Sequence, residues 1–166
     1  MRILVRVLLR SEKTARLLQD ADVLAWNVRP ASMARLGLSY DDVRAVNPRL
    51  IYCGMFGFGQ DGPYASVPAY DPIIQGASGV AGLHERAFGE PRFVPYVMAD
   101  RTSGLIAVQM IAMALFHRER TGEGQHLDIC LLDTQVAMMA NMGAIPAIVD
   151  MPLLMIWAFF GDSEME

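Results

Sequence analysis

The sequence has few cysteines and no hydrophobic run long enough to cross a membrane. Its two cysteines, Cys53 and Cys130, lie far apart, each in an apolar run typical of a strand. This spacing argues against a disulfide scaffold or a zinc site and indicates buried, reduced thiols in a cytoplasmic protein. The apolar run at residues 104–116 is shorter than the about 20 residues of a membrane helix. The basic, apolar start is interrupted by Arg6 and lacks a small-residue cleavage site, so we expect neither a signal peptide nor a membrane partner.

Charge is also scarce, which excludes several classes of function. Charged residues make up 19% of the chain, and the net charge is −4. The basic residues are scattered, so we expect no nucleic-acid partner, although single arginines can still bind a phosphorylated small molecule. The histidines at 84, 117 and 126 show no zinc or triad spacing, and G-x-S-x-G does not occur. We therefore expect no metal site and no permanently bound cofactor.

What is abundant is hydrophobic sequence arranged in alternating elements. The chain has 166 residues, 53% of them hydrophobic, which is enough for one domain with a core. We predict that Ser39 and Asp42 form a capping box at the start of a helix. The patterns predict strands at residues 22–26, 49–58 and 125–132, and helices at residues 31–38, 39–47, 71–83, 100–120 and 133–145. This alternation predicts an α/β domain with a parallel or mixed sheet.

The stretch GFGQDG, residues 57–62, matches the dinucleotide-binding pattern G-x-G-x-x-G after a predicted strand. That function also needs a helix directly after the glycines, whose amides would bind the pyrophosphate. Pro63 and Pro68 follow instead, so no helix can start soon enough. We interpret the stretch as a glycine-rich turn near a ligand, and a nicotinamide-binding module remains a weaker alternative.

A single carboxylate, Asp100 in the stretch YVMADRTSG, precedes the longest predicted helix. The ordinary interpretation is a helix N-cap that accepts amides near Thr102 and Ser103. The positive end of the helix dipole would keep such a carboxylate ionised, and carboxylates also serve as covalent nucleophiles. Gly104 would let a substrate approach the backbone closely. Cap and nucleophile are compatible roles.

Five stretches together resemble the family III CoA-transferases, which include formyl-CoA:oxalate and carnitine CoA-transferases and related acyl-CoA racemases. They are DVLAWNVRPASMARLGL, NPRLIYCGMFGFGQDGPY, AYDPIIQGASG, VMADRTSGLIA and RERTGEGQHLDICLLD. Their order and spacing fit the family over residues 21–140. The resemblance implies an acyl-CoA substrate and a small carboxylic acid as partners, with CoA moved through an aspartyl anhydride and an aspartyl-CoA thioester.

The resemblance also implies roles for particular residues. Asp100 falls on the catalytic aspartate. The acyl pocket takes Tyr70 and Asp71, and we group Gly57 of the glycine-rich turn with them. The CoA-binding candidates are Asn27, Val28, Arg29 and Arg35. Val28 stands where the family usually has an aromatic residue, and Arg35 is alternatively a solvated helix arginine.

The racemases of this family carry His at the Tyr70 position. A phenol of pKa ~10 is a poor base at neutral pH, so an acyl-CoA racemase or isomerase is the alternative enzyme. A remnant that at most binds CoA is the alternative outside catalysis.

The resemblance covers only part of the family's fold. We expect an incomplete Rossmann-like large domain at residues 1–146, lacking the first βαβ portion and the small domain. Residues 147–166 are expected to be a divergent C-terminal tail. Members of the family form interlocked dimers, so the resemblance implies a homodimer, and we expect impaired activity in a fragment of this length.

Overall fold

The four strands in the computed structural model, which describes residues 3–5 and 12–140, form one parallel sheet in the order β1-β2-β3-β4. Every neighbouring pair is parallel, with Val23 opposite Ile51 and Tyr52 opposite His126. The strands are β1 (Ile3–Val5), β2 (Val23–Trp26), β3 (Ile51–Phe56) and β4 (His126–Cys130). The expected α/β class is confirmed, and of the two expected sheet types the parallel one is found.

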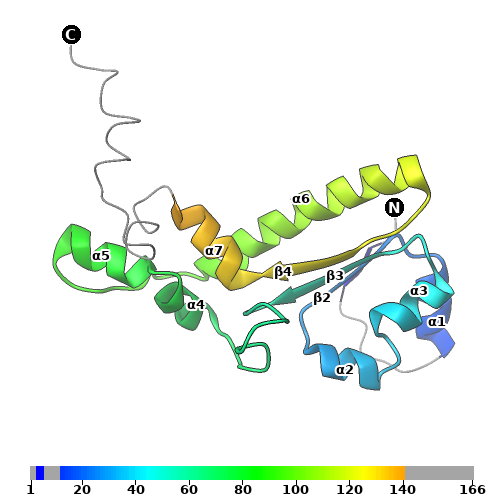
Figure 1. Ribbon diagram of the computed structural model, residues 1–166, viewed down its shortest axis with the longest axis horizontal. Coiled ribbons are helices and arrows are strands. Elements are labelled where there is room, and N and C mark those ends of the chain that lie inside the picture. The colour runs from blue at the N-terminus through cyan, green and yellow to red at the C-terminus, as the bar shows by residue number, and fades with distance from the viewer. Residues whose placement is uncertain (1–2, 6–11, 141–166) are drawn as a thin grey trace, which may run out of the picture.

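Helices cross from each strand to the next, so both faces of the sheet are covered (Figure 1). Parallel strands require such crossovers. After β1 comes the helix α1 (Glu12–Gln19), and after β2 come α2 (Pro30–Arg35) and α3 (Tyr40–Val46). The strand β3 is followed by α4 (Asp71–Ala77), α5 (Val80–Phe88) and α6 (Met98–Thr121). The strand β4 is followed by α7 (Leu131–Met139). The helices α1, α2 and α3 lie on one face, and α6 lies along the other.

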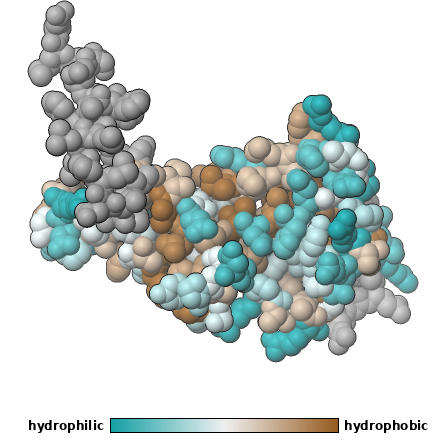
Figure 2. Space-filling view, viewed as in Figure 1, coloured by the Kyte–Doolittle hydropathy of each residue, from teal (hydrophilic) through white to brown (hydrophobic). Residues whose placement is uncertain are grey.

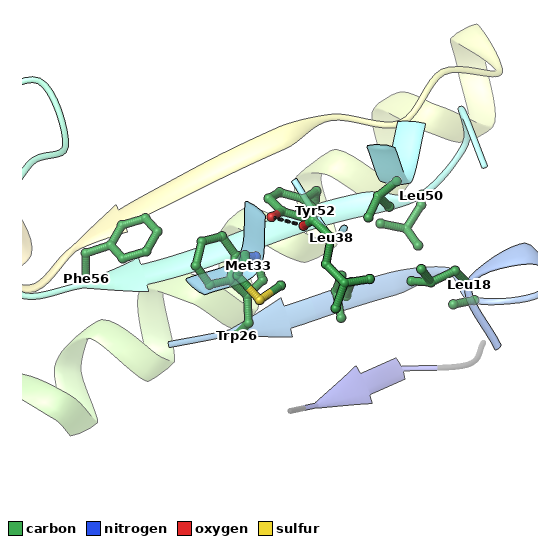
Figure 3. Packing of buried hydrophobic residues seen from close by; sticks show 10 residues of the cluster. Leu18, Trp26, Met33, Leu38, Leu50, Tyr52 and Phe56 are labelled. Carbon is green, nitrogen blue, oxygen red and sulfur yellow. Dashed lines mark hydrogen bonds between the residues drawn. The ribbon is translucent and has the colours of Figure 1, made fainter. Parts of the chain in front are cut away.

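Alternating side chains of β2 and β3 build a hydrophobic core on each face of the sheet. Toward α2 and α3 the core contains Trp26, Tyr52 and Phe56, and the Tyr52 hydroxyl donates a hydrogen bond to the Leu38 carbonyl at 2.7 Å (Figure 3). Toward α6 it contains Ile51 and Cys53, with Val23, Ala107, Ala114, Leu127 and Ile129. This period of two explains why both strands read as continuously apolar in the sequence.

Local signals in the sequence set several helix ends. Ser39 and Asp42 form the predicted capping box, with the Asp42 amide bonded to the Ser39 hydroxyl. Gly37 closes the turn after α2 with a φ of 68°. The prediction of a single helix at residues 71–83 is wrong. It is divided into α4 and α5 at Gly79, whose φ of 88° takes the chain out of the helical path.

The helix α6 combines a sheet-facing side of small residues with an exposed apolar side. Ala107 and Ala114 are buried against the sheet, whereas Leu105, Val108 and Phe116 are exposed. Figure 2 shows hydrophobic side chains at the surface along this helix and beside α7. Within residues 3–5 and 12–140, no helix is long and apolar enough to cross a membrane. The expected tail at 147–166 and the end of the helix expected at 133–145 lie outside the described residues.

Candidate functional site

A cavity of about 510 Å³ opens at the carboxyl ends of β2 and β3. Its wall comes from the segment after β2, the end of β3 and the loop that follows, the first turns of α6 and the start of α7. Ligands in parallel α/β folds commonly bind at this edge of the sheet, where the chain leaves each strand. The arrangement therefore brings loops that are distant in sequence around one space.

Asp100 lines this cavity from the first turn of α6. The helix begins at Met98, and its N-cap residue is Val97, which makes no side-chain capping bond. The interpretation of Asp100 as the N-cap is therefore wrong, because the residue lies inside the helix. Its side chain is exposed, and none of the described residues donates a hydrogen bond to its carboxylate.

The electrostatics of Asp100 also differ from the sequence-based expectation. Partial burial in the cavity wall, and secondarily the charge of Asp71, raise the pKa of the Asp100 carboxyl above its ordinary value of 3.8. The helix dipole is expected to favour the ionised form of Asp100, but these two effects act in the opposite direction and the pKa is raised. Asp100 is thus a carboxylate whose pKa is raised and which accepts no hydrogen bond from the described part of the chain.

Asp71 lies behind Asp100 instead of in the cavity wall. Its side chain is 6% exposed, and one carboxylate oxygen, Oδ2, accepts the Asp100 backbone N–H at 3.0 Å. Oδ1 accepts the side-chain amide of Gln75 at 2.7 Å. Asp71 therefore supports the start of α6 from the neighbouring helix α4.

Gly57 lines the cavity at the point where β3 ends. A Cβ atom at this position would lie 2.0 Å from the Cβ of Ala69, so only glycine allows the two segments to approach so closely. The Gly57 carbonyl also accepts the Leu132 amide at 3.1 Å, which ties this turn to α7. No helix follows the glycines until α4 begins at Asp71, which confirms that GFGQDG lacks the context of a dinucleotide site.

The remaining predicted site residues divide into two groups. Asn27, Val28, Arg29 and Tyr70 line the same cavity as Asp100. Tyr70 is 72% exposed, and Val28 packs partly against the core beneath α2. Arg35 lies outside the lining, in the last turn of α2, where it is exposed and donates to the Ser32 hydroxyl at 3.1 Å.

Sequence reasoning missed several residues of this region as site residues, among them Gln60, Gln75, Ser103 and Leu131. Three of these four line the cavity, and Gln75 lies beneath it. The spacing of Asp71 and Gln75, four residues apart on one helix, is a signal that was present in the sequence. Gln60 belongs to the glycine-rich turn that is expected from the sequence to lie near a ligand, whereas for Leu131 the sequence offered no signal, because only the fold brings it to the cavity.

The cysteines fit the expectation of free thiols. Cys53 is buried in β3, and burial, with the charge of Asp128, raises its pKa to about 11. Cys130 is only half-buried, so the expectation of a buried thiol is wrong for this residue. Its sulfur accepts the Asp133 amide at the start of α7 because the thiol takes the N-cap position.

Comparison with known proteins gives one consistent result. Residues 10–148 match the family described as CoA-transferase family III. A succinate–glutarate CoA-transferase of Agrobacterium fabrum is 44% identical over 126 residues, which are 76% of this chain and 32% of the relative. An acetyl-CoA:oxalate CoA-transferase of Acetobacter aceti is 43% identical over 126 residues, which are 75% of this chain and 32% of that relative.

Solved structures show the same likeness. A CaiB/BaiF family protein from Brucella suis superimposes with a TM-score of 0.75 at 35% identity, covering 95% of this chain and 40% of that one. Rv3272 from Mycobacterium tuberculosis gives a TM-score of 0.77 at 31% identity, covering 90% of this chain and 42% of that one. The chain spans about a third of the length of the curated relatives it matches. On its sequence and on its fold, the chain belongs to CoA-transferase family III.

Proposed function

We propose that this protein moves CoA from an acyl-CoA thioester to a free carboxylic acid, with Asp100 as the covalent nucleophile. The observation that carries this proposal is the Asp100 carboxylate, which lines a cavity at the carboxyl edge of a parallel sheet and accepts no hydrogen bond from any described residue. Because the oxygens of such a carboxylate are not occupied by hydrogen bonds, they are available to attack a carbonyl carbon.

Each step exchanges one activated acyl bond for another, so the transfer needs no external energy source. An Asp100 oxygen attacks the thioester carbonyl, forming an acyl-aspartyl anhydride as the C–S bond breaks and CoA leaves as a thiolate. The thiolate then attacks the Asp100 carbonyl of the anhydride, giving an aspartyl-CoA thioester and the first acid. An incoming carboxylate displaces the thiolate and forms a second anhydride. Attack of the thiolate on the new acyl carbonyl completes the transfer and restores Asp100.

Binding of the CoA portion is assigned to the segment after β2 and to α2. Asn27, Val28 and Arg29 line the Asp100 cavity, and Arg35 is exposed on the adjoining helix. An arginine fork suits a CoA phosphate because it bonds two oxygens at once. Tyr70 and Gly57 border the acyl group, and Asp71 supports the start of α6 beneath Asp100. We propose no permanently bound cofactor, since CoA is the group transferred.

The acyl donor and acceptor are assigned by chemistry to small carboxylic acids. Relatives are named for succinate and glutarate, for oxalate, and for formyl-CoA with oxalate. Succinyl-CoA with glutarate is therefore the first pair to test. We further propose a homodimer, in which the exposed apolar residues Leu105, Val108 and Phe116 of α6 form part of the contact surface. Residues 1–146 would supply the large-domain portion and 147–166 a divergent tail.

Chemical trapping tests this function. The protein is mixed with succinyl-CoA, quenched with hydroxylamine or borohydride, digested and analysed by mass spectrometry. We expect modification in the tryptic peptide of residues 93–101, in which Asp100 is the only acidic side chain. Asp100→Asn should abolish it. Absence of modification in folded wild-type protein would reject the proposal and leave the CoA-binding remnant, whereas exchange of the acyl α-proton with solvent would favour the racemase.

A further inference from the structure

Gln75 is a buried residue of α4 whose side-chain amide is fully engaged. It is 1% exposed and lies outside the lining of the Asp100 cavity. Its two Nε2 hydrogens face three acceptors, namely Asp71 Oδ1 at 2.7 Å, the Tyr96 carbonyl at 3.2 Å and the Val94 carbonyl at 3.3 Å. Its Oε1 accepts the Val94 amide at 2.8 Å. One side chain therefore connects α4 to the loop that leads into α6.

The same loop determines where α6 begins. The Tyr96 carbonyl, held by Gln75, also accepts the Met98 amide at 2.8 Å. Asp71, held by Gln75 through Oδ1, accepts the Asp100 amide through Oδ2. The first amides of a helix have no partner within the helix. Because Val97 supplies no side-chain cap, these two bonds satisfy the Met98 and Asp100 amides in its place.

We propose that Gln75 is a positioning residue for Asp100, fixing the nucleophile in the cavity through Asp71 and through the Tyr96 carbonyl. The inference rests on the proposed function in that Asp100 is taken as the nucleophile. Gln75 itself does not reach the cavity, so it acts only through the residues that it holds.

The chemistry of the site explains why an amide is suited to this position. The residue must donate to a carboxylate on one side and accept a backbone N–H on the other, and a glutamine does both without a charge. Glutamate has the same shape, and when protonated it can also donate to Asp71. When ionised it cannot donate, and it adds a negative charge beside the buried Asp71 carboxylate.

The experiment compares three variants of the full chain. Gln75→Leu removes all four contacts. Gln75→Glu in its protonated form keeps the donation to Asp71 and the acceptance of the Val94 amide, and in its ionised form it loses the donation to Asp71. The matched control is Gln135→Leu in α7, because Gln135 is equally buried but its amide has no hydrogen-bond partner among the described residues. Each variant is assayed for acyl-CoA affinity, for the rate of Asp100 modification by succinyl-CoA, and for hydrogen exchange at the Val94 and Asp100 amides.

The expected result is a change in rate without a change in affinity. Gln75→Leu should modify Asp100 about tenfold more slowly or worse, with succinyl-CoA affinity unchanged and faster exchange at the two amides, whereas Gln135→Leu should match wild type. Gln75→Glu should approach the wild-type rate as the pH falls from about 8 to about 5 and protonates the new carboxylate. If Gln75→Leu does not fold, the pH dependence of the Gln75→Glu rate tests the positioning role in its place, because a merely structural role would not produce this dependence.

Other outcomes would overturn the inference. An unchanged rate in Gln75→Leu, an equal loss in Gln135→Leu, or a Gln75→Glu rate that keeps a constant ratio to wild type at every pH would each do so. If wild-type Asp100 is never modified, the proposed function fails. The positioning of Asp100 by Gln75 is then decided by hydrogen exchange alone, where unchanged exchange at Val94 and Asp100 in the Gln75 variants overturns it.

Discussion

The carboxylate of Asp71 accepts a hydrogen bond from the backbone amide of Asp100, at 3.0 Å. Two acidic residues from different helices are thereby placed together, one buried as a support and the other open to the cavity. The negative charge of Asp71 is close enough to raise the pKa of Asp100. The support of the helix and the tuning of the nucleophile are therefore two effects of one residue.

Removal of the Asp71 charge should lower the pKa of Asp100. In Asp71→Asn the like charge is absent, so the ionised form of Asp100 is favoured at a lower pH. Titration of the Asp100 carboxyl carbon by NMR measures this directly. The variant should also lose about 1–3 kcal/mol of unfolding free energy, because buried partners of Asp71 are imperfectly satisfied by an amide. An Asp100 pKa that stays the same or rises would contradict this explanation.

Two glycine positions should respond in opposite ways to alanine. Gly57→Ala forces an overlap with Ala69 and should cost about 1–3 kcal/mol of unfolding free energy. Gly104→Ala meets no atom within 4 Å and lies inside α6, so it should stabilise the protein by about 0.5–1 kcal/mol. Denaturant titration measures both. If substrate approaches the α6 backbone at Gly104, the stabilised variant will nevertheless modify Asp100 more slowly.

Arg35 should affect the binding of CoA rather than the chemistry at Asp100. Arg35→Ala should weaken acyl-CoA affinity about three- to tenfold, with a smaller effect at high salt because the contact is exposed and charged. Arg44→Ala, an exposed arginine in the last turn of α3, is the control. Calorimetric titration with CoA at two salt concentrations provides the measurement. Equal losses in the two variants would remove Arg35 from the CoA site.

Burial of Cys53 should make the protein less stable in alkali. The pKa of the thiol is raised from an ordinary 9.0 to about 11 in the folded protein. Above about pH 9 the unfolded chain releases this proton before the folded chain does, so the free energy of unfolding falls as the pH rises toward 11. The fall attributable to Cys53 is at most about 2–3 kcal/mol. Cys53→Ala should show a shallower decline between pH 9 and 11 in urea titrations, and an identical slope would contradict the assignment.

The sequence predicted the core elements of the fold because their signals are local. The strands β2, β3 and β4 are continuous apolar or alternating runs, and the α3 capping box lies within a few residues of sequence. The division at Gly79 was missed because a glycine is compatible with either a helix interior or a turn until the packing of α4 and α5 decides. The start of α6 was placed at Asp100 because Asp is a favoured N-cap residue.

The candidate site was predictable in its residues but not in their arrangement. The family resemblance identified Tyr70 and Asn27 and singled out Asp100, and the fold brings these three to one cavity. The exclusion of Asp71 and Arg35 from the cavity wall depends on how α4 and α2 pack, which involves contacts between residues far apart in the chain. The role of Gln75 in the structure depends on a loop that lies nineteen residues further along the sequence.

Transfer of oxygen-18 is the most direct test of Asp100 as a covalent nucleophile. The protein turns over succinyl-CoA with glutarate labelled in its carboxylates, and the tryptic peptide of residues 93–101 is weighed. The anhydride formed from labelled glutarate leaves one of its oxygens on the aspartate, so the mechanism predicts oxygen-18 in Asp100 after turnover, and none with unlabelled glutarate. Formation of glutaryl-CoA by the wild-type protein without any label in Asp100 would contradict the account.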